Sequence, residues 1–209
     1  MYGQGSRTYG PHDYVQGLIL VIVNFDSFTY NLVQLIGCTT GEIRVERNDV
    51  LTPKEISVMS PDGIVISPGP GRPIDAGICN EVVAKLGPTI PILGICLGHQ
   101  VIGEVYGAEV TYAPTLMHGK TSTVCHHGNQ LFKGVPPQFE ATRYHSLVLH
   151  PQSIPDCLVV TAATPDGVIM GVQHATHPVE GVQFHPESVM TRDGPTLVNN
   201  WLARLGIQP

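Results

Sequence analysis

Apolar segments of strand length alternate with helix-like segments over the first half of the chain. Most of the apolar runs are continuous, which is typical of strands buried on both faces of a sheet. The strands are expected at residues 17–24, 42–45, 63–67 and 89–95. Helices are expected at residues 27–36, 75–86 and 97–106, and from the capping box Thr52-Pro53-Lys54-Glu55. Four alternations of strand and helix predict an α/β fold: an open, mostly parallel sheet with helices on both faces.

The pattern changes after Gly107, where short alternating segments replace the long apolar runs. We interpret them as antiparallel additions to the same sheet, followed by a final helix over residues 195–205. The additions are expected at residues 120–125, 158–164, 168–173 and 179–184. Residues 1–16 are rich in Gly, Tyr and Ser without apolar periodicity, which predicts a loose N-terminal arm. The chain therefore divides into this arm and one domain over residues 17–209.

Composition and charge exclude some classes of binding partner. The 209 residues are 42% hydrophobic and only 13% charged, which is typical of a compact globular chain. The formal net charge is −6 and no basic run occurs, so neither nucleic acid nor an anionic membrane surface is an expected partner. The longest apolar run, residues 18–23, is far shorter than the roughly 20 residues of a membrane helix. Because the N-terminus also lacks a signal-peptide pattern, we expect a cytoplasmic protein.

The cysteines and histidines favour neither a disulfide framework nor a metal site. Five cysteines are present without any Cys-x-x-Cys pair. His174 and His177 stand three positions apart, but no third ligand lies nearby, so a bound metal ion is not expected. An odd number of cysteines leaves room for one of them to be a reactive thiol.

The clearest chemical signal is the segment Gly94-Ile95-Cys96-Leu97-Gly98, where an apolar strand turns directly into a helix. This is the nucleophile-elbow pattern with cysteine at its centre. The turn strains the central residue, and the two glycines allow neighbouring backbone to pass closely. The partial positive charge at the helix N-terminus favours a thiolate there. The alternative interpretation is a buried cysteine in a tight turn, without a catalytic role.

A cysteine nucleophile requires a base, and the base requires an orienting group. His99 is the nearest histidine, but no carboxylate follows it within reach on the same helix. His185-Pro186-Glu187 supplies both groups. If the strand that begins near residue 179 continues, His185 and Glu187 point to one face, because strand side chains repeat every second residue. Taken alone, a His-Pro-Glu segment is also compatible with a surface turn.

An oxyanion hole is the third requirement. The backbone N–H of Leu97, directly after the nucleophile, provides one donor in an elbow. The glycine loop, Ser67-Pro68-Gly69-Pro70-Gly71, follows a buried strand and lies at the same sheet edge as Cys96 if the strands are parallel. Its alternative interpretation is a turn without a ligand. Gln100 is one helical turn beyond Cys96, so its amide either pairs with a polar substrate or is an ordinary helix-surface group.

These residues resemble the class I glutamine amidotransferase family, and within it the glutaminase subunits of anthranilate synthase and aminodeoxychorismate synthase. The resemblance extends over about residues 18–205. It rests on the segments DSFTYN (26–31), SPGPG (67–71), GICLGHQ (94–100), MHGK (117–120), YHSL (144–147) and GVQFHPES (181–188). It implies a flavodoxin-like class I glutaminase fold and a catalytic triad of Cys96, His185 and Glu187. The substrate contacts that it implies are Gly69, Pro70, Gly71 and Leu97 around the oxyanion, and Gln100, Ser146 and Leu147 at the amino-acid end of glutamine.

The resemblance also implies an activity: hydrolysis of L-glutamine to glutamate, with ammonia delivered to a chorismate-using synthase subunit. The first hypothesis for this partner is anthranilate synthase, in tryptophan biosynthesis; the alternative is aminodeoxychorismate synthase, in p-aminobenzoate and folate biosynthesis. No cofactor is implied in this chain, whereas magnesium is expected in the partner. A hypothesis of another class is a stand-alone cysteine amidohydrolase or γ-glutamyl peptidase. An inactive scaffold is disfavoured by the intact Cys96, His185 and Glu187.

Overall fold

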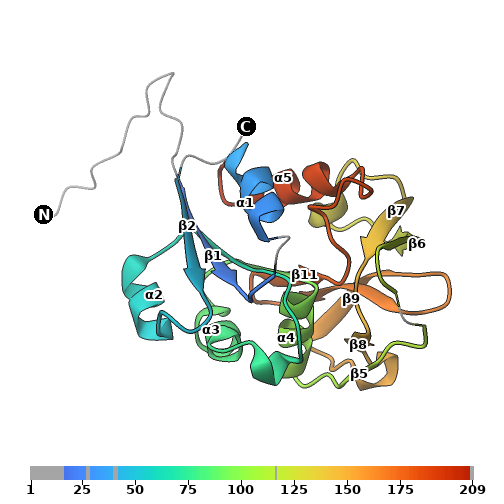
Figure 1. The fold of residues 1–209 in the computed structure, drawn as a ribbon, viewed down its shortest axis with the longest axis horizontal. Helices are drawn as coiled ribbons and strands as arrows, with labels where there is room; N and C mark the ends of the chain where they lie inside the picture. The colour runs from blue at the N-terminus through green and yellow to red at the C-terminus, as the bar shows by residue number, and fades with distance from the viewer. Residues whose placement is uncertain (1–16, 27–28, 40–41, 116, 208–209) are drawn as a thin grey trace, which may run out of the picture.

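A nine-stranded mixed sheet forms the centre of the computed structural model (Figure 1). The structure describes residues 17–26, 29–39, 42–115 and 117–207, so the predicted arm at residues 1–16 lies outside the described residues. The strand order is β2-β1-β3-β4-β11-β10-β9-β6-β7. The strands β5 (Val110–Tyr112) and β8 (Leu147–Leu149) pair separately as a two-stranded antiparallel sheet.

The first five strands of this order are parallel and the last four are antiparallel. The parallel strands are β2 (Glu42–Arg47), β1 (Leu18–Val23), β3 (Gly63–Ile66), β4 (Ile92–Ile95) and β11 (Val179–Val182). The antiparallel strands are β10 (Ile169–His174), β9 (Leu158–Ala163), β6 (Lys120–His126) and β7 (Gln138–Arg143). The predicted fold class, a mostly parallel sheet with antiparallel additions, is confirmed.

One strand direction was predicted wrongly. The segment at residues 179–184 was expected to be an antiparallel addition, but β11 runs parallel to β4, with Val182 beside Ile95. The chain returns to the centre of the sheet after forming its antiparallel edge, and a local pattern of apolar residues carries no information about strand direction. The strands β5, β7 and β8 were not predicted.

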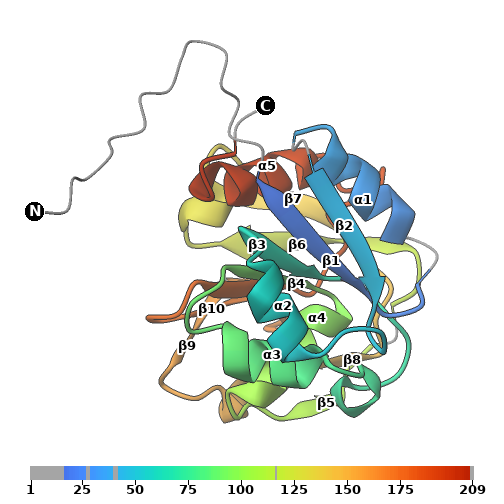
Figure 2. The ribbon, with the colours of Figure 1, turned by 90° about the vertical axis from the view of Figure 1, so that its left-hand side faces the viewer.

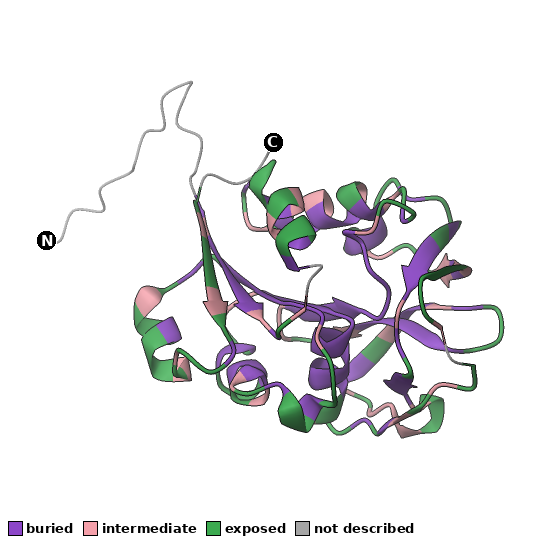
Figure 3. Ribbon diagram, in the orientation of Figure 1, coloured by how far each residue is buried: buried purple, intermediate pink, exposed green. Residues whose placement is uncertain are grey.

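Helices cover both faces of the sheet, as expected (Figure 2). The helices α1 (Thr29–Gly37) and α5 (Gly194–Arg204) pack on one face, where Trp201 is fully buried. The helices on the other face are α2 (Pro53–Met59), α3 (Cys79–Leu86) and α4 (Leu97–Val105). The central strands are buried from both sides, whereas the outer faces of the helices are exposed (Figure 3). This burial explains the continuous apolar runs of β1, β3 and β4.

Local sequence signals account for several element boundaries. The predicted capping box begins α2: the Glu55 N–H donates to Thr52 Oγ1 (3.3 Å) and the Thr52 N–H donates to Glu55 Oε2 (2.8 Å). The third helix begins at Cys79 rather than at residue 75, because Gly77 adopts a left-handed conformation (φ 56°) after a 3₁₀ turn at Pro73–Asp75. No helix within the described ranges is long and apolar enough to cross a membrane.

The five parallel strands end at one edge of the sheet, and each is followed directly by a polar or nucleophilic residue. Asn48 follows β2, Asn24 follows β1, Ser67 follows β3, Cys96 follows β4 and Gln183 follows β11. All five residues are buried. The carboxyl edge of a parallel sheet is where ligands bind in open α/β folds. The topology therefore gathers these chemically capable groups at one end of the molecule.

Candidate active site

Cys96 occupies a strained turn between β4 and α4. Its φ is 52°, a left-handed value that side chains other than glycine rarely adopt, and its N–H donates to the Val182 carbonyl at 2.9 Å. The flanking glycines have no room for a side chain. A Cβ on Gly94 would lie 2.5 Å from the backbone of Gly98, and a Cβ on Gly98 would lie 2.5 Å from the Ile66 carbonyl oxygen. The elbow thus depends on both glycines, as its sequence pattern predicts.

His185 and Glu187 form a buried pair, but not by the route expected from sequence. The strand β11 ends at Val182, so the two side chains do not share a strand face. Instead a turn at Pro186 brings the Glu187 carboxylate back onto the imidazole, with Oε1 at 2.5 Å from His185 Nδ1. The His185 N–H donates to the Thr142 carbonyl at 3.0 Å, which anchors the turn on β7. Proline favours such a turn because its φ is restricted.

The surroundings of His185 favour its protonated form. Burial by itself lowers the pKa of this imidazole, but the charge and hydrogen bonding of Cys96 and then of Glu187 outweigh it and raise the pKa well above 6.5. The Tyr144 ring packs edge-on against the imidazole, with ring centroids 5.0 Å apart. A buried imidazolium between a sulfur and a carboxylate can stabilise a thiolate and can deliver a proton to a leaving group.

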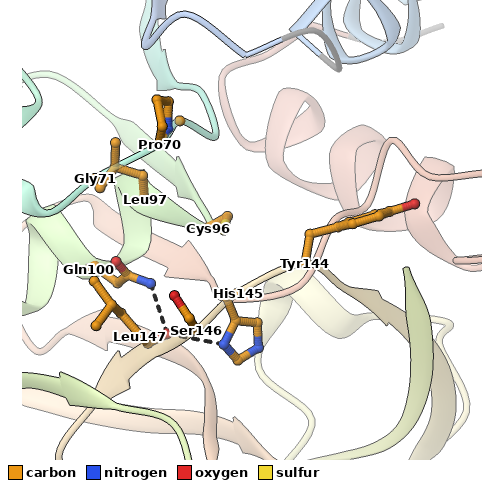
Figure 4. A pocket seen from close by; sticks show the side chains of 10 residues that line it. Pro70, Gly71, Cys96, Leu97, Gln100, Tyr144, His145, Ser146 and Leu147 are labelled. Carbon is orange, nitrogen blue, oxygen red and sulfur yellow. Dashed lines mark hydrogen bonds between the residues drawn. The ribbon is translucent and has the colours of Figure 1, made fainter. Parts of the chain in front are cut away.

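A cavity of about 140 Å³ opens beside Cys96 (Figure 4). The glycine loop forms one wall, so it shares a rim with the elbow as expected. Gly69 packs so closely that a Cβ there would lie 2.4 Å from the Cβ of Asn24. The residues that line the cavity are Gly69, Pro70, Gly71, Cys96, Leu97, Gln100, Tyr144, His145, Ser146 and Leu147. The structure therefore gathers all seven residues predicted for substrate and oxyanion binding around one cavity.

The wall opposite the glycine loop is held by hydrogen bonds that converge on the Leu147 carbonyl. Gln100 Nε2 donates to this oxygen at 3.0 Å and His145 Nδ1 lies 3.0 Å from it, as Figure 4 shows. His145 Nε2 accepts from Arg143 Nε at 3.1 Å, so Nδ1 carries the proton. Burial, followed by the charge of Arg143, lowers the pKa of His145 to about 3. His145 is therefore a neutral positioning group and not a second base.

The histidine nearest to Cys96 in sequence is not a candidate base. His99 is fully buried on α4, against β11: a Cβ on Gly181 would meet its backbone at 3.1 Å. Burial is the main cause that lowers the pKa of His99 to about 3, and His145 adds to it. His99 therefore remains neutral at physiological pH, and the imidazole paired with Cys96 is that of His185.

The comparison with protein families agrees with this geometry. A family model described as class I glutamine amidotransferase matches residues 20–205. The chain belongs to the class I glutamine amidotransferase family. It is 50% identical over 185 residues to the aminodeoxychorismate/anthranilate synthase component 2 of Bacillus subtilis, covering 88% of this chain and 95% of the relative. It is 48% identical over 194 residues to the anthranilate synthase component 2 of Pseudomonas aeruginosa, covering 90% and 96%.

Other relatives are longer than this glutamine amidotransferase. The bifunctional protein TrpGD of Thermotoga maritima is 50% identical over 206 residues, which are 98% of this chain and 35% of the relative. Among solved structures, a protein of Thermoplasma acidophilum described as a GMP synthase subunit superposes with a TM-score of 0.82 at 24% identity, covering 91% of this chain and 94% of that one. At this identity the likeness supports the fold, which is the flavodoxin-like class I glutaminase fold.

Two residues of this class I glutamine amidotransferase site were not predicted from the sequence. Gln183 is fully buried, and its Nε2 donates to Cys96 Sγ at 3.6 Å. Asn24 donates two hydrogen bonds to Ser67, the first residue of the glycine loop. For Asn24 a signal was available, because a polar residue directly after a continuous apolar strand in an α/β sheet lies at the edge where ligands bind. Gln183 gave no such signal, because Glu180 interrupts the apolar residues of β11. Only Ser67 and Cys96 were placed at this edge by that rule.

Proposed function

We propose that this class I glutamine amidotransferase is the glutaminase subunit of anthranilate synthase, which hydrolyses L-glutamine to glutamate and passes the ammonia to a chorismate-using synthase subunit. The observation that carries the proposal is the buried cluster of Cys96, His185 and Glu187 beside a cavity lined by the glycine loop. The identity of the partner is supported by the names of relatives that match this chain over nearly their whole length.

The first half of the reaction uses the thiolate and the imidazolium. The Cys96 thiolate attacks the side-chain carbonyl carbon of glutamine, forming a C–S bond and a tetrahedral oxyanion. The Leu97 N–H and the backbone of the glycine loop stabilise this oxyanion. The His185 imidazolium donates its proton to the departing nitrogen, so that the C–N bond breaks and ammonia leaves. A γ-glutamyl thioester and a neutral imidazole remain.

The second half regenerates the enzyme. Neutral His185 accepts a proton from water, whose oxygen attacks the thioester carbonyl. The C–S bond breaks, glutamate is released and the sulfur leaves as a thiolate beside the regenerated imidazolium. Glu187 holds the imidazole through Nδ1, so that Nε2 is the nitrogen available to the reacting atoms in both halves.

The chemistry of the product supports a partner docked near the cavity. Ammonia that escapes into water near neutral pH becomes ammonium and loses its nucleophilic lone pair. A synthase subunit that receives ammonia directly avoids this loss. An aminodeoxychorismate synthase is the second candidate partner, and the observation that favours it is the Bacillus subtilis relative, which is named for both enzymes at 50% identity.

Cys96→Ser tests the assignment of the nucleophile. In the complex with the synthase, we expect glutamine-dependent product formation to fall to background while formation from added ammonium salt persists. Cys38→Ser is the matched control, because Cys38 is exposed and should leave both activities unchanged. Loss of both activities in the Cys96 variant, or glutamine use by that variant, would contradict the proposed division of labour.

The partner is tested by purifying the chain with each candidate synthase of the same organism and measuring anthranilate against aminodeoxychorismate formed from glutamine. Product with the anthranilate synthase subunit supports the first candidate, and product only with the other synthase replaces it by the second. High turnover of γ-glutamyl peptides by the isolated chain, with no stimulation by either synthase, would instead identify a stand-alone amidohydrolase.

A further inference from the structure

Gln183 lies between the nucleophile and the substrate-facing wall of the cavity. It is fully buried, and its side-chain amide makes two hydrogen bonds and also interacts with the side chain of His99. Its Nε2 donates to Cys96 Sγ at 3.6 Å, and its Oε1 accepts from Gln100 Nε2 at 3.1 Å. One amide thus joins the reacting sulfur to the glutamine at position 100.

We propose that Gln183 is a further catalytic residue, which holds the Cys96 thiolate with its amide N–H and fixes Gln100 with its amide oxygen. The proposal rests on the proposed function, since it assigns a role within the same reaction. The sequence motif His-Pro-Glu does not include this residue, and its role follows from the two hydrogen bonds of its side chain.

The orientation of the Gln183 amide is determined by its neighbours. The Leu147 carbonyl can only accept, so Gln100 must present its NH₂ group to it. The same NH₂ group reaches Gln183, which must therefore present its oxygen to Gln100. Its own NH₂ group is then left for the sulfur. A flipped Gln183 amide would place two NH₂ groups against each other, so the backbone carbonyl of Leu147 sets the direction of both amides.

The position of Gln183 is as constrained as its orientation. Its backbone N–H donates to the Met170 carbonyl at 3.0 Å, which ties it to β10. The carbonyl of the preceding residue, Val182, accepts from the Cys96 N–H at 2.9 Å, which ties the end of β11 to the elbow. The donor and the sulfur are therefore held together by backbone contacts on both sides, and little ordering is needed when the thiolate forms.

A thiolate in this buried place needs such a donor. Hydrogen bonds to charged groups are about twice as strong as those between neutral groups. The ionisable side chains around the sulfur are His185 with its partner Glu187, the neighbouring Tyr144 and His145, and His99 on α4. Of the three histidines only His185 is a cation at neutral pH, because burial lowers the pKa of both His145 and His99 to about 3. Gln183 therefore supplies a second, neutral donor that does not titrate.

Gln183→Met tests the proposal, because methionine has a similar length and fits irregular interiors but cannot donate to the sulfur. We expect the rate of Cys96 alkylation by iodoacetamide at neutral pH, and kcat for glutamine, each to fall by roughly 10- to 100-fold. The pH profile of alkylation should move to higher pH, and the KM for glutamine should rise because Gln100 is released. Gln173→Met on the neighbouring strand β10 is the matched control, and it should behave as the parent protein.

The outcomes separate this proposal from the proposed function. Alkylation requires neither glutamine nor a partner, so it reports on Gln183 even if no synthase is activated by the chain. A Gln183→Met profile that coincides with that of Gln173→Met would overturn the proposal. If Gln183→Met fails to fold, Gln183→Asn replaces it: the shorter amide stays polar but withdraws from the sulfur, and the same slow alkylation is expected. Normal alkylation by this variant would also overturn the proposal.

Discussion

Asn24 and Ser67 are joined by two hydrogen bonds across the ends of the adjacent strands β1 and β3. The Asn24 N–H donates to Ser67 Oγ and the Asn24 Nδ2 group donates to the Ser67 carbonyl, both at 2.9 Å. Asn24 Oδ1 in turn accepts from Asn48 Nδ2 at 2.8 Å. Because Gly69 packs directly on Asn24, this buried network supports the glycine loop, which lines the same cavity as Cys96. The glycine-loop wall of the cavity is therefore supported by residues that do not line it.

Asn24→Ala is expected to loosen the glycine loop, because it removes the partner of the Asn48 amide and of the Ser67 carbonyl. The free energy of unfolding should fall by about 1–3 kcal/mol, as for other buried polar groups that lose their hydrogen bonds. The kcat for glutamine should fall by roughly 10- to 100-fold, because an error of about 1 Å in positioning is costly in catalysis. Urea unfolding and glutaminase assays measure the two effects. Asn199→Ala, on α5, is the control, and an equal loss of kcat there would refute this explanation.

Gly69→Ala tests the close approach of the loop itself. The new Cβ would lie 2.4 Å from the Asn24 Cβ and 2.6 Å from the Asn24 carbonyl oxygen, so the loop must move away. We predict a loss of glutamine hydrolysis that exceeds any loss of stability. Gly128→Ala is the matched control: its φ of 79° carries strain, but no atom lies within 4 Å of the added group. Comparable glutaminase activities of the two variants would rule out a role for the close approach.

Glu187→Gln should separate the charge of the carboxylate from its shape. The charge and hydrogen bond of Glu187 help to raise the pKa of His185, so their removal lowers that pKa. The alkaline limb of the kcat/KM profile should move to lower pH, and kcat should fall by roughly 100-fold or more, as in other nucleophile–histidine–carboxylate triads. A full pH profile provides the measurement. Glu140→Gln, on the exposed side of β7, should change neither quantity.

The two buried neutral histidines predict a loss of stability in mild acid. The pKa of His99 and that of His145 are each lowered to about 3 in the folded protein, against about 6.5 in an unfolded chain. Their contribution to the free energy of unfolding is complete above pH 6.5. It is lost as the pH falls toward 3, by about 1.4 kcal/mol per pH unit for each histidine. His185 acts in the opposite direction, since its raised pKa gives stability that is lost only as the pH rises through it.

Urea unfolding between pH 7 and pH 5 measures this dependence. His99→Gln should reduce the slope by about 1.4 kcal/mol per pH unit. His127→Gln, at an exposed position, should leave the slope unchanged. Equal slopes in all three proteins would mean that His99 does not remain neutral in the folded state.

Elements with strong local signals were predictable from the sequence. The capping box at Thr52 located α2, and the glycines on either side of Cys96 located the elbow, because each signal is a steric requirement of a few consecutive residues. Boundaries were less accurate: β4 begins at Ile92 rather than at residue 89, since a turn precedes it. The pairing of His185 with Glu187 was predicted, but through a continued strand, whereas a turn at Pro186 makes the contact.

By itself, then, the amino-acid order determined the alternation of strands and helices, the strained cysteine and the residues able to serve as its acid and base. Only the tertiary structure decided that β11 lies parallel to β4. This arrangement brings His185 and Gln183 to Cys96 Sγ, although Gln183 is 87 positions away from Cys96 in the sequence. The physical reason is that backbone strain and amphipathic period act over a few residues. The direction of a strand depends instead on contacts between segments distant in sequence. So does the orientation of a side-chain amide such as that of Gln183, which lies between two partners.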